Sequence, residues 1–277
     1  MGRGGETMKS AQEAKADQNY QAALTELLYQ LADDDFIIAF RGSEWLGLAP
    51  HIEEDVAFSS INQDTMGHAA IYYQLLEDLG QGDADALAHG REASQRKNAV
   101  LLEEVNGPGH YLKKPLYDWA FAVVRHYFYA QAKKIRIESL KNSSYQPLAD
   151  AAVKINMELY YHLLHWKTWF TQLATAKGEA PERMKNAIEK VSADMGGVLA
   201  LGPKEEEMAA LGLIESEEVL TQRWNREMEK VFAPLPMSLP AVEMKRGDGR
   251  SGVHTSDLDS ALTTLSEVYK QDPVASW

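Results

Sequence analysis

The chain has 277 residues and a formal net charge of −13, because 41 acidic residues outnumber 28 basic ones. Nucleic acid and anionic membranes repel such a surface, so neither is an expected partner. Cysteine is absent, which excludes disulfides, thiol catalysis and thiolate-bound metal centres. No apolar run approaches the ~20 residues of a membrane span, and the N-terminus has no apolar secretion segment. We therefore expect a soluble, cytoplasmic protein.

Residues 1–16 are mostly small or polar, and we expect a flexible N-terminal arm followed by a single domain over residues 17–277. Within this domain, apolar residues recur every three or four positions, which is typical of helices that bury one face. Val198–Leu201 is the one short run that resembles a strand, too little for a sheet. The sequence predicts four helices of more than 20 residues, at residues 17–41, 51–79, 114–140 and 148–173.

The connections between these helices are short, long and short. The middle one, residues 80–113, contains a predicted helix at 95–105. This order is typical of a ferritin-like four-helix bundle, whose middle connection runs the length of the molecule. Further helices are predicted at residues 182–194, 215–232 and 255–271. We expect an all-α, ferritin-like bundle with a long middle crossover and extra C-terminal helices.

A ferritin-like bundle raises the question of a di-metal site, which takes Glu from two helices and Glu-x-x-His from the other two. The i, i+3 spacing puts both side chains on one helical face. In the second helix Thr65 stands three residues before His68, and in the fourth Tyr161 stands three residues after Glu158. The third helix has no Asp or Glu between Trp119 and Ile137. We expect no catalytic, cofactor-binding or metal-ligating residue in this chain.

Two polar pairs remain on the second and fourth helices. Asp64 and His68 are four residues apart, and so are Glu158 and His162, so each pair shares a helical face. One interpretation is a buried, hydrogen-bonded network that fills the space of a lost metal pair. The other interpretations are a single divalent ion held by these four groups, or side chains that point to solvent.

Two further clusters have a structural and a functional interpretation. The aromatic group Tyr160, Tyr161, His165, Trp166 and Trp169 is more typical of a core or an interface than of a ligand box. The most basic stretch comprises residues 125–127 together with Lys133 and Lys134. It is either a solvated or ion-paired face, or a contact for a partner or for the phosphates of CoA.

One stretch between the first two helices carries a specific pattern: residues 41–47 (RGSEWLG), then Ala49-Pro50 and residues 53–57 (EEDVA). This pattern resembles the signature of the phenylacetic acid catabolic protein family. The likeness covers about residues 20–277. It includes Asp64 and Gly67, residues 125–128, Glu158 with Tyr161-His162, residues 252–255 and Trp277. Ser43 departs from the family pattern, where Gly is usual, and His68 stands where relatives can carry Gln.

The resemblance implies a function. In this family one ferritin-like subunit holds a di-iron centre and epoxidises the ring of phenylacetyl-CoA, while a related bundle without metal pairs with it. A further, small subunit bridges the assembly, and a reductase supplies electrons from NADPH. The chain is similar to the metal-free bundle. We therefore expect a non-catalytic structural subunit of a ring 1,2-phenylacetyl-CoA epoxidase in aerobic phenylacetate degradation, with the di-iron cofactor in its partner. The alternative is a ferritin-like, metal-dependent oxidase or oxygenase in its own right.

The same resemblance suggests where the catalytic partner binds. In related two-bundle oxygenases the first two helices of each bundle pack against each other. The candidate exposed aromatic residues of that face are Trp45, Phe58, Tyr72 and Tyr73, and the alternative for each of them is a place in the chain's own core.

Overall fold

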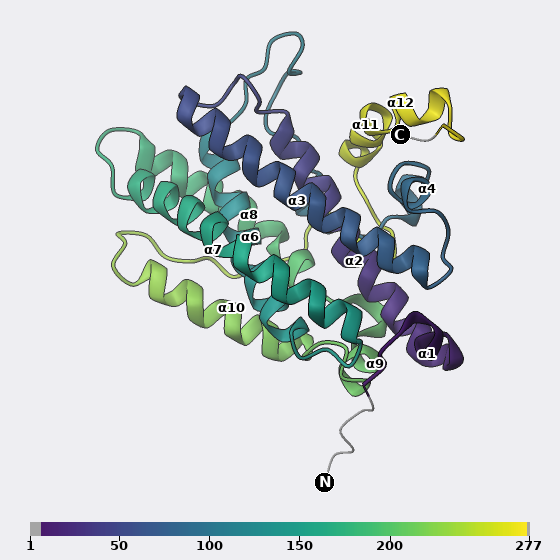
Figure 1. Ribbon diagram of the computed structural model, residues 1–277. Coiled ribbons are helices and arrows are strands. Elements are labelled where there is room, and N and C mark those ends of the chain that lie inside the picture. Colours follow the sequence, from purple (N-terminus) through teal and green to yellow (C-terminus); the bar gives the residue numbers. More distant parts are fainter. Residues whose placement is uncertain (1–6, 276–277) are drawn as a thin grey trace. The chain divides into compact units, whose positions relative to one another are not determined.

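The computed structural model describes residues 7–275. Over these residues the secondary structure is helical, apart from an isolated parallel bridge between Met8 and Tyr145. The predicted all-α fold and the four long helices are confirmed, and their order along the chain is consistent with a ferritin-like bundle (Figure 1). The four are α2 (Gln18–Ser43), α3 (Ile52–Asp78), α6 (Trp119–Leu140) and α7 (Gln146–Ala174).

The described residues form two compact units, and the single domain over residues 17–277 stays a prediction. The α2–α3 unit contains residues 10–105 and the chain from Arg246 onward. The α6–α7 unit contains the described residues up to Lys9 and Asn106–Lys245. Each unit is built on one pair of long helices joined by a short connection, because neighbouring helices on a short loop pack against each other.

The N-terminal arm is partly helical rather than flexible. Ser10 caps α1 (Ala11–Ala16) by accepting a hydrogen bond from the backbone N–H of Glu13, and α1 packs on α2. Residues 1–6 of the expected arm and Trp277 lie outside the described residues.

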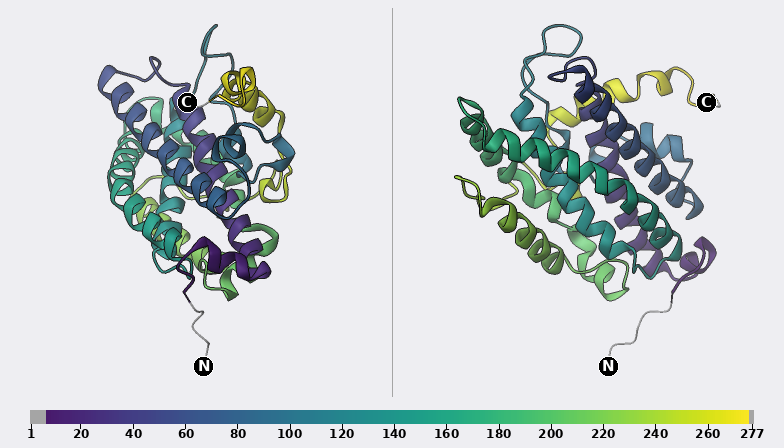
Figure 2. Two further views of the ribbon diagram at one scale, coloured as in Figure 1. Left: turned by 45° about the vertical axis from the view of Figure 1, so that its right-hand side comes forward. Right: turned by 60° about the vertical axis from the view of Figure 1, so that its left-hand side comes forward.

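In the α2–α3 unit the two long helices lie side by side (Figure 2). A Cβ at Gly42 of α2 would lie 2.1 Å from Oδ1 of Asn62 in α3, so a larger residue at this position would displace the side chain of Asn62. The crossover forms α4 (Ala84–His89) and α5 (Val100–Glu103). The C-terminal helix predicted at 255–271 is interrupted at Ser266, whose hydroxyl donates to the carbonyl of His89 (2.7 Å). It therefore forms α11 (Ser256–Leu265) and α12 (Glu267–Gln271).

In the α6–α7 unit, α6 packs on α7 and on α8 (Ala180–Leu199), and α10 (Glu217–Phe232) packs on α6. The indole N–H of Trp224 in α10 donates to the carbonyl of Phe128 (3.3 Å), which fixes this contact. The short helix α9 (Glu205–Ala210) precedes α10. Val198, predicted in a strand-like run, is buried in the last turn of α8, because its apolar side chain completes that helix's buried face.

None of the helices within residues 7–275 is both long and apolar enough to cross a membrane.

Candidate functional site

On α3, Thr65 stands where a metal-ligating glutamate would be, and its hydroxyl is hydrogen-bonded to the backbone of the same helix. The hydroxyl of Thr65 donates to the backbone carbonyl of Ile61 at 2.7 Å, and Thr65 is buried. His68 is also buried, while Asp64 is half-buried. A threonine hydroxyl held in this way offers no carboxylate charge to a metal ion.

On α7, the two candidate ligand positions lie on the exposed face. Glu158 and Tyr161 are exposed, whereas His162 is buried. Glu158 therefore matches the interpretation in which a side chain points to solvent, while His162 is buried. Residues i and i+4 of a helix point in directions that differ by about 40°. At the edge of the buried face this difference is enough to leave Glu158 exposed and His162 buried.

On α6, the inner face is cationic. Arg125, His126, Lys133 and Arg136 are all buried. Arg125 donates to Oδ1 of Asn106 (2.7 Å), and Arg136 donates to the carbonyl of Ala200 (3.2 Å). Burial, with the neighbouring charge of Arg125, lowers the pKa of His126 to about 3. Arg125 and His126 are therefore not part of a solvated face, and a contact of this stretch with a partner or with CoA phosphates stays a prediction.

These donor sets do not fit a di-metal centre. Over residues 7–275, no three His, Asp or Glu side chains gather where they could hold a metal ion. The hydrogen-bonded network of Asp64, His68, Glu158 and His162 stays a prediction.

The carboxylates of α2 are neutralised by arginines. Asp33 is fully buried, and it forms an ion pair with Arg91 and a longer one with Arg96 (3.4 Å). It also accepts hydrogen bonds from the hydroxyl of Tyr73 (2.6 Å) and the backbone N–H of Lys97 (2.9 Å). Burial would raise the pKa of Asp33, but the charges of Arg91 and Arg96 and these side-chain hydrogen bonds lower it.

Asp34 binds the C-terminal segment. Both of its oxygens accept hydrogen bonds from Arg250, each at 2.8 Å, and the pair is buried. Oδ1 of Asp34 also accepts the backbone N–H of Ala99 (2.8 Å). The helix predicted at residues 95–105 is therefore shortened to α5, because the N–H groups of Lys97 and Ala99 bind side chains of α2 instead of a helical carbonyl.

Glu103 of α5 binds the same C-terminal segment a few residues further on. It accepts hydrogen bonds from His254 (2.8 Å) and from the hydroxyl (2.9 Å) and backbone N–H (2.7 Å) of Thr255. Burial would lower the pKa of His254, but the hydrogen bond and charge of Glu103 raise it. We call the set Asp33, Asp34, Arg91, Arg96, Glu103, Arg250 and His254 the buried ionic network.

The buried ionic network was not predicted from the sequence. The signal that could have found it is the run Asp33–Asp35 inside an otherwise apolar helix, since buried carboxylates need cations facing them. The resemblance did include residues 252–255, which contain His254.

The corner between α2 and α3 contains the sequence pattern of residues 41–47. Arg41 donates to the carbonyls of Glu103 and Asp257, each at 2.8 Å, and pairs with Glu44 (3.0 Å). Gly47 has a positive φ of 78° and its N–H donates to Asp55 (2.7 Å). The pattern therefore fixes the turn between the two helices and ties it to the crossover and the C-terminal segment.

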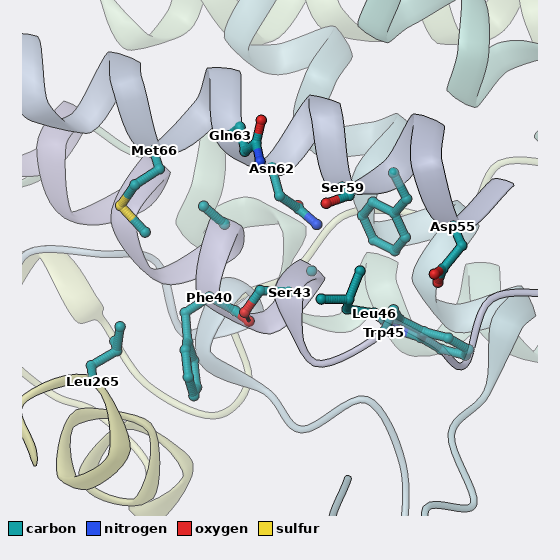
Figure 3. Close-up of a pocket in the computed structure, with 13 residues that line it drawn as sticks. Phe40, Ser43, Trp45, Leu46, Asp55, Ser59, Asn62, Gln63, Met66 and Leu265 are labelled. Carbon is teal, nitrogen blue, oxygen red and sulfur yellow. Dashed lines mark hydrogen bonds between the residues drawn. The ribbon is translucent and has the colours of Figure 1, made fainter. Parts of the chain in front are cut away.

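A cavity of about 290 Å³ lies at this corner (Figure 3). Phe40 and Ser43 of α2 line one side of it, and Asn62 and Met66 of α3 line another. Most of its wall is apolar, and two of its polar side chains are already hydrogen-bonded: Ser43 donates to the carbonyl of Phe40 (2.7 Å), and Asp55 accepts from the N–H of Gly47 (2.7 Å). The cavity suits an apolar group better than a charged one.

The four aromatic residues expected at a partner interface are part of the core. Trp45, Phe58, Tyr72 and Tyr73 are each less than 5% exposed, so the expectation of exposed side chains is wrong. They are buried because the helix faces that carry them pack inside this chain. The exposed apolar side chains at the corner are instead Leu46, Ile52 and Val56, at 64–70%.

The aromatic cluster of α7 does not form a ligand box. Trp166 is buried and stacks on His126 (4.9 Å between ring centroids), and Trp169 packs edge-on against Trp119 (5.4 Å). Tyr160 and Tyr161 lie on the exposed face of the helix.

The family described as "Phenylacetic acid catabolic protein" matches the chain over residues 8–277. The chain therefore belongs to the phenylacetic acid catabolic protein family, which confirms the resemblance carried by residues 41–57. It is also similar to the C subunit of 1,2-phenylacetyl-CoA epoxidase from Escherichia coli (strain K12). The identity is 25% over 255 residues, which cover 92% of this chain and 99% of that protein.

The first prediction concerns the pair of Asp34 and Arg250. Arg250→Met leaves a buried carboxylate without its cation, so we expect a loss of about 3–5 kcal/mol in the free energy of unfolding, measured with urea. The double variant D34L/R250M should recover more than half of this loss. Arg183→Met, which breaks the exposed pair with Asp118, should cost less than about 1 kcal/mol. Equal costs for R250M and R183M would contradict the assignment.

The second prediction concerns pH. Because the pKa of His254 is raised in the folded chain, its contribution to stability is complete below the unfolded pKa of about 6.5 and is lost as pH rises through the folded pKa. The free energy of unfolding should therefore fall as pH rises above about 6.5, and His254→Gln should flatten this decline. His110→Gln, at an exposed site, is the matched control. An unchanged decline in H254Q would rule out this role.

Proposed function

We propose that this chain is the non-catalytic structural subunit of a multicomponent 1,2-phenylacetyl-CoA epoxidase in the cytoplasm. In this proposal it pairs with the catalytic subunit, which holds the di-iron centre. A small bridging subunit and an NADPH-dependent reductase complete the assembly.

The observation that supports this proposal most strongly is that the buried carboxylates of α2 form ion pairs with arginines of the same chain. The buried acids Asp33 and Asp34 are bound by Arg91, Arg96 and Arg250, so they are not available to a metal. The inner face of α6 supplies cations where a metal pair would need anions. Family membership adds that the bundle is related to proteins of phenylacetate catabolism, and the similarity to the E. coli epoxidase protein spans nearly all of both chains.

A structural subunit needs a surface for its partner. The corner of α2 and α3 exposes Leu46, which lines the apolar cavity, and it also exposes Ile52 and Val56 in the first turns of α3. Exposed apolar residues beside a cavity are typical of a protein interface, in which an apolar side chain of one partner fills a pocket of the other. We propose that the catalytic subunit inserts an apolar side chain here.

The third prediction concerns metal. The purified chain, expressed with added iron, should contain well under one iron per molecule by mass spectrometry, because α6 carries no carboxylate between Trp119 and Ile137 and position 65 is threonine instead of glutamate. The catalytic subunit purified in the same way is the control. Stoichiometric iron that disappears in His68→Ala would contradict the proposal and favour a metal-dependent oxidase.

The fourth prediction concerns the partner. Co-expression with the catalytic subunit should give a complex that survives gel filtration, and the catalytic partner expressed on its own should lose solubility or activity. Ile52→Glu with Val56→Glu should weaken the complex at least tenfold without altering the fold, because both side chains are exposed. Val268→Glu, equally exposed but remote in sequence, is the matched control. Full epoxidation of phenylacetyl-CoA by the catalytic partner without this chain would refute the structural role.

A further inference from the structure

The exposed face of α7 carries a regular repeat. Exposed residues follow one another at alternating spacings of four and three, which is the a/d pattern of a helix that packs against another helix. We call this set the α7 seam; it consists of Gln146, Asp150, Val153, Met157, Tyr160, Leu164, Lys167 and Thr171. The buried face of α7 is separate from it and includes Leu148, Ile155 and Phe170.

The centre of the α7 seam is apolar and its ends are polar. Val153, Met157, Tyr160 and Leu164 are 51–65% exposed, and Tyr161 beside them is 70% exposed. Together these five side chains expose on the order of 600 Å², at the upper end of the largest apolar patch on a typical monomer. An apolar centre with a polar rim is the usual anatomy of a protein interface.

The order of residues along the α7 seam is symmetric about the midpoint between Glu158 and Leu159. If a second α7 runs antiparallel across this midpoint, Met157 faces Tyr160 and Val153 faces Leu164. The same register places Asp150 opposite Lys167, once on each side. Each contact then joins an a position to a d position, as antiparallel helix pairs require.

Charge selects this orientation over the parallel one. A parallel pair in register would put Asp150 against Asp150 and Lys167 against Lys167, and like charges at such positions are unfavourable. Among the described residues, the one polar partner of Asp150 is Gln146 on the same helix, from which it accepts a hydrogen bond (2.8 Å). Its charge is therefore available to a lysine of another chain.

We propose that the α7 seam is a self-association surface, which pairs antiparallel with the α7 seam of a second copy of this chain about a two-fold axis. Two copies that each cover about 600 Å² bury about 1,200 Å² in total, which is the lower limit for specific interfaces. The pairing is independent of the corner of α2 and α3, so it goes beyond the proposed function and does not depend on it.

The test begins with the purified chain alone, at 0.15 M salt, by sedimentation equilibrium. We expect a monomer–dimer equilibrium in the micromolar range. Asp150→Lys and Lys167→Asp should each weaken the dimer at least tenfold, because each creates two like-charge contacts. The double variant D150K/K167D should restore the dimer to within about threefold of the original. Glu229→Lys on α10, with the same change in charge at an exposed site, is the control and should leave the dimer unchanged.

A covalent test uses the absence of cysteine from the chain. V153C/L164C should form a disulfide-linked dimer with oxidised glutathione, because the two positions face each other between copies but lie about 16 Å apart along one helix. V153C alone should not. A chain that is monomeric at 100 µM, or a dimer that is insensitive to the charge variants, would overturn the proposal. So would seam variants that abolish binding of the catalytic partner while the chain alone is always monomeric, because the seam would then belong to that partner.

Discussion

Asp33 and Asp34 place two carboxylates inside an apolar helix, and this charge has to be compensated within the α2–α3 unit. A buried anion without a cation costs several kcal/mol, so the chain must bring cations to it. Arg91 and Arg96 come from the crossover and Arg250 from the C-terminal segment. The long crossover and the C-terminal segment are therefore held on α2 by charge, and Glu103 with His254 extends the same arrangement.

This compensation has a consequence for function. Carboxylates that receive two or three hydrogen bonds from arginines and backbone N–H groups are fixed in position and fully used. A metal centre would need such carboxylates to be open to the ion. On α3, the hydroxyl of Thr65 donates to the backbone carbonyl of Ile61 in the same helix. On α7, Glu158 and Tyr161 are exposed. The polar groups of the described residues thus hold the bundle's segments together, which fits a chain that supports a partner's chemistry.

The sequence predicted most of the fold because long helices leave a strong periodic signal. The four long helices were predicted within about five residues, and the short connection between the first two follows from where their periodic patterns end and begin. The crossover was predicted less well, because the backbone of Lys97 and Ala99 binds aspartates that are distant in sequence. The sequence pattern indicates that Trp45 and Tyr73 are covered, but it does not distinguish burial in the chain's own core from burial against a partner.

The central claim is that this chain supports a catalytic partner without a reacting centre of its own. The most direct measurement is single-turnover epoxidation of phenylacetyl-CoA by the reconstituted complex, with D64N/H68Q/E158Q/H162Q in this chain and complex formation verified by gel filtration. These substitutions replace the ionisable side chains of the two polar pairs with neutral amides. The account predicts an unchanged turnover rate in the intact complex. A complex that assembles normally but loses turnover would contradict it.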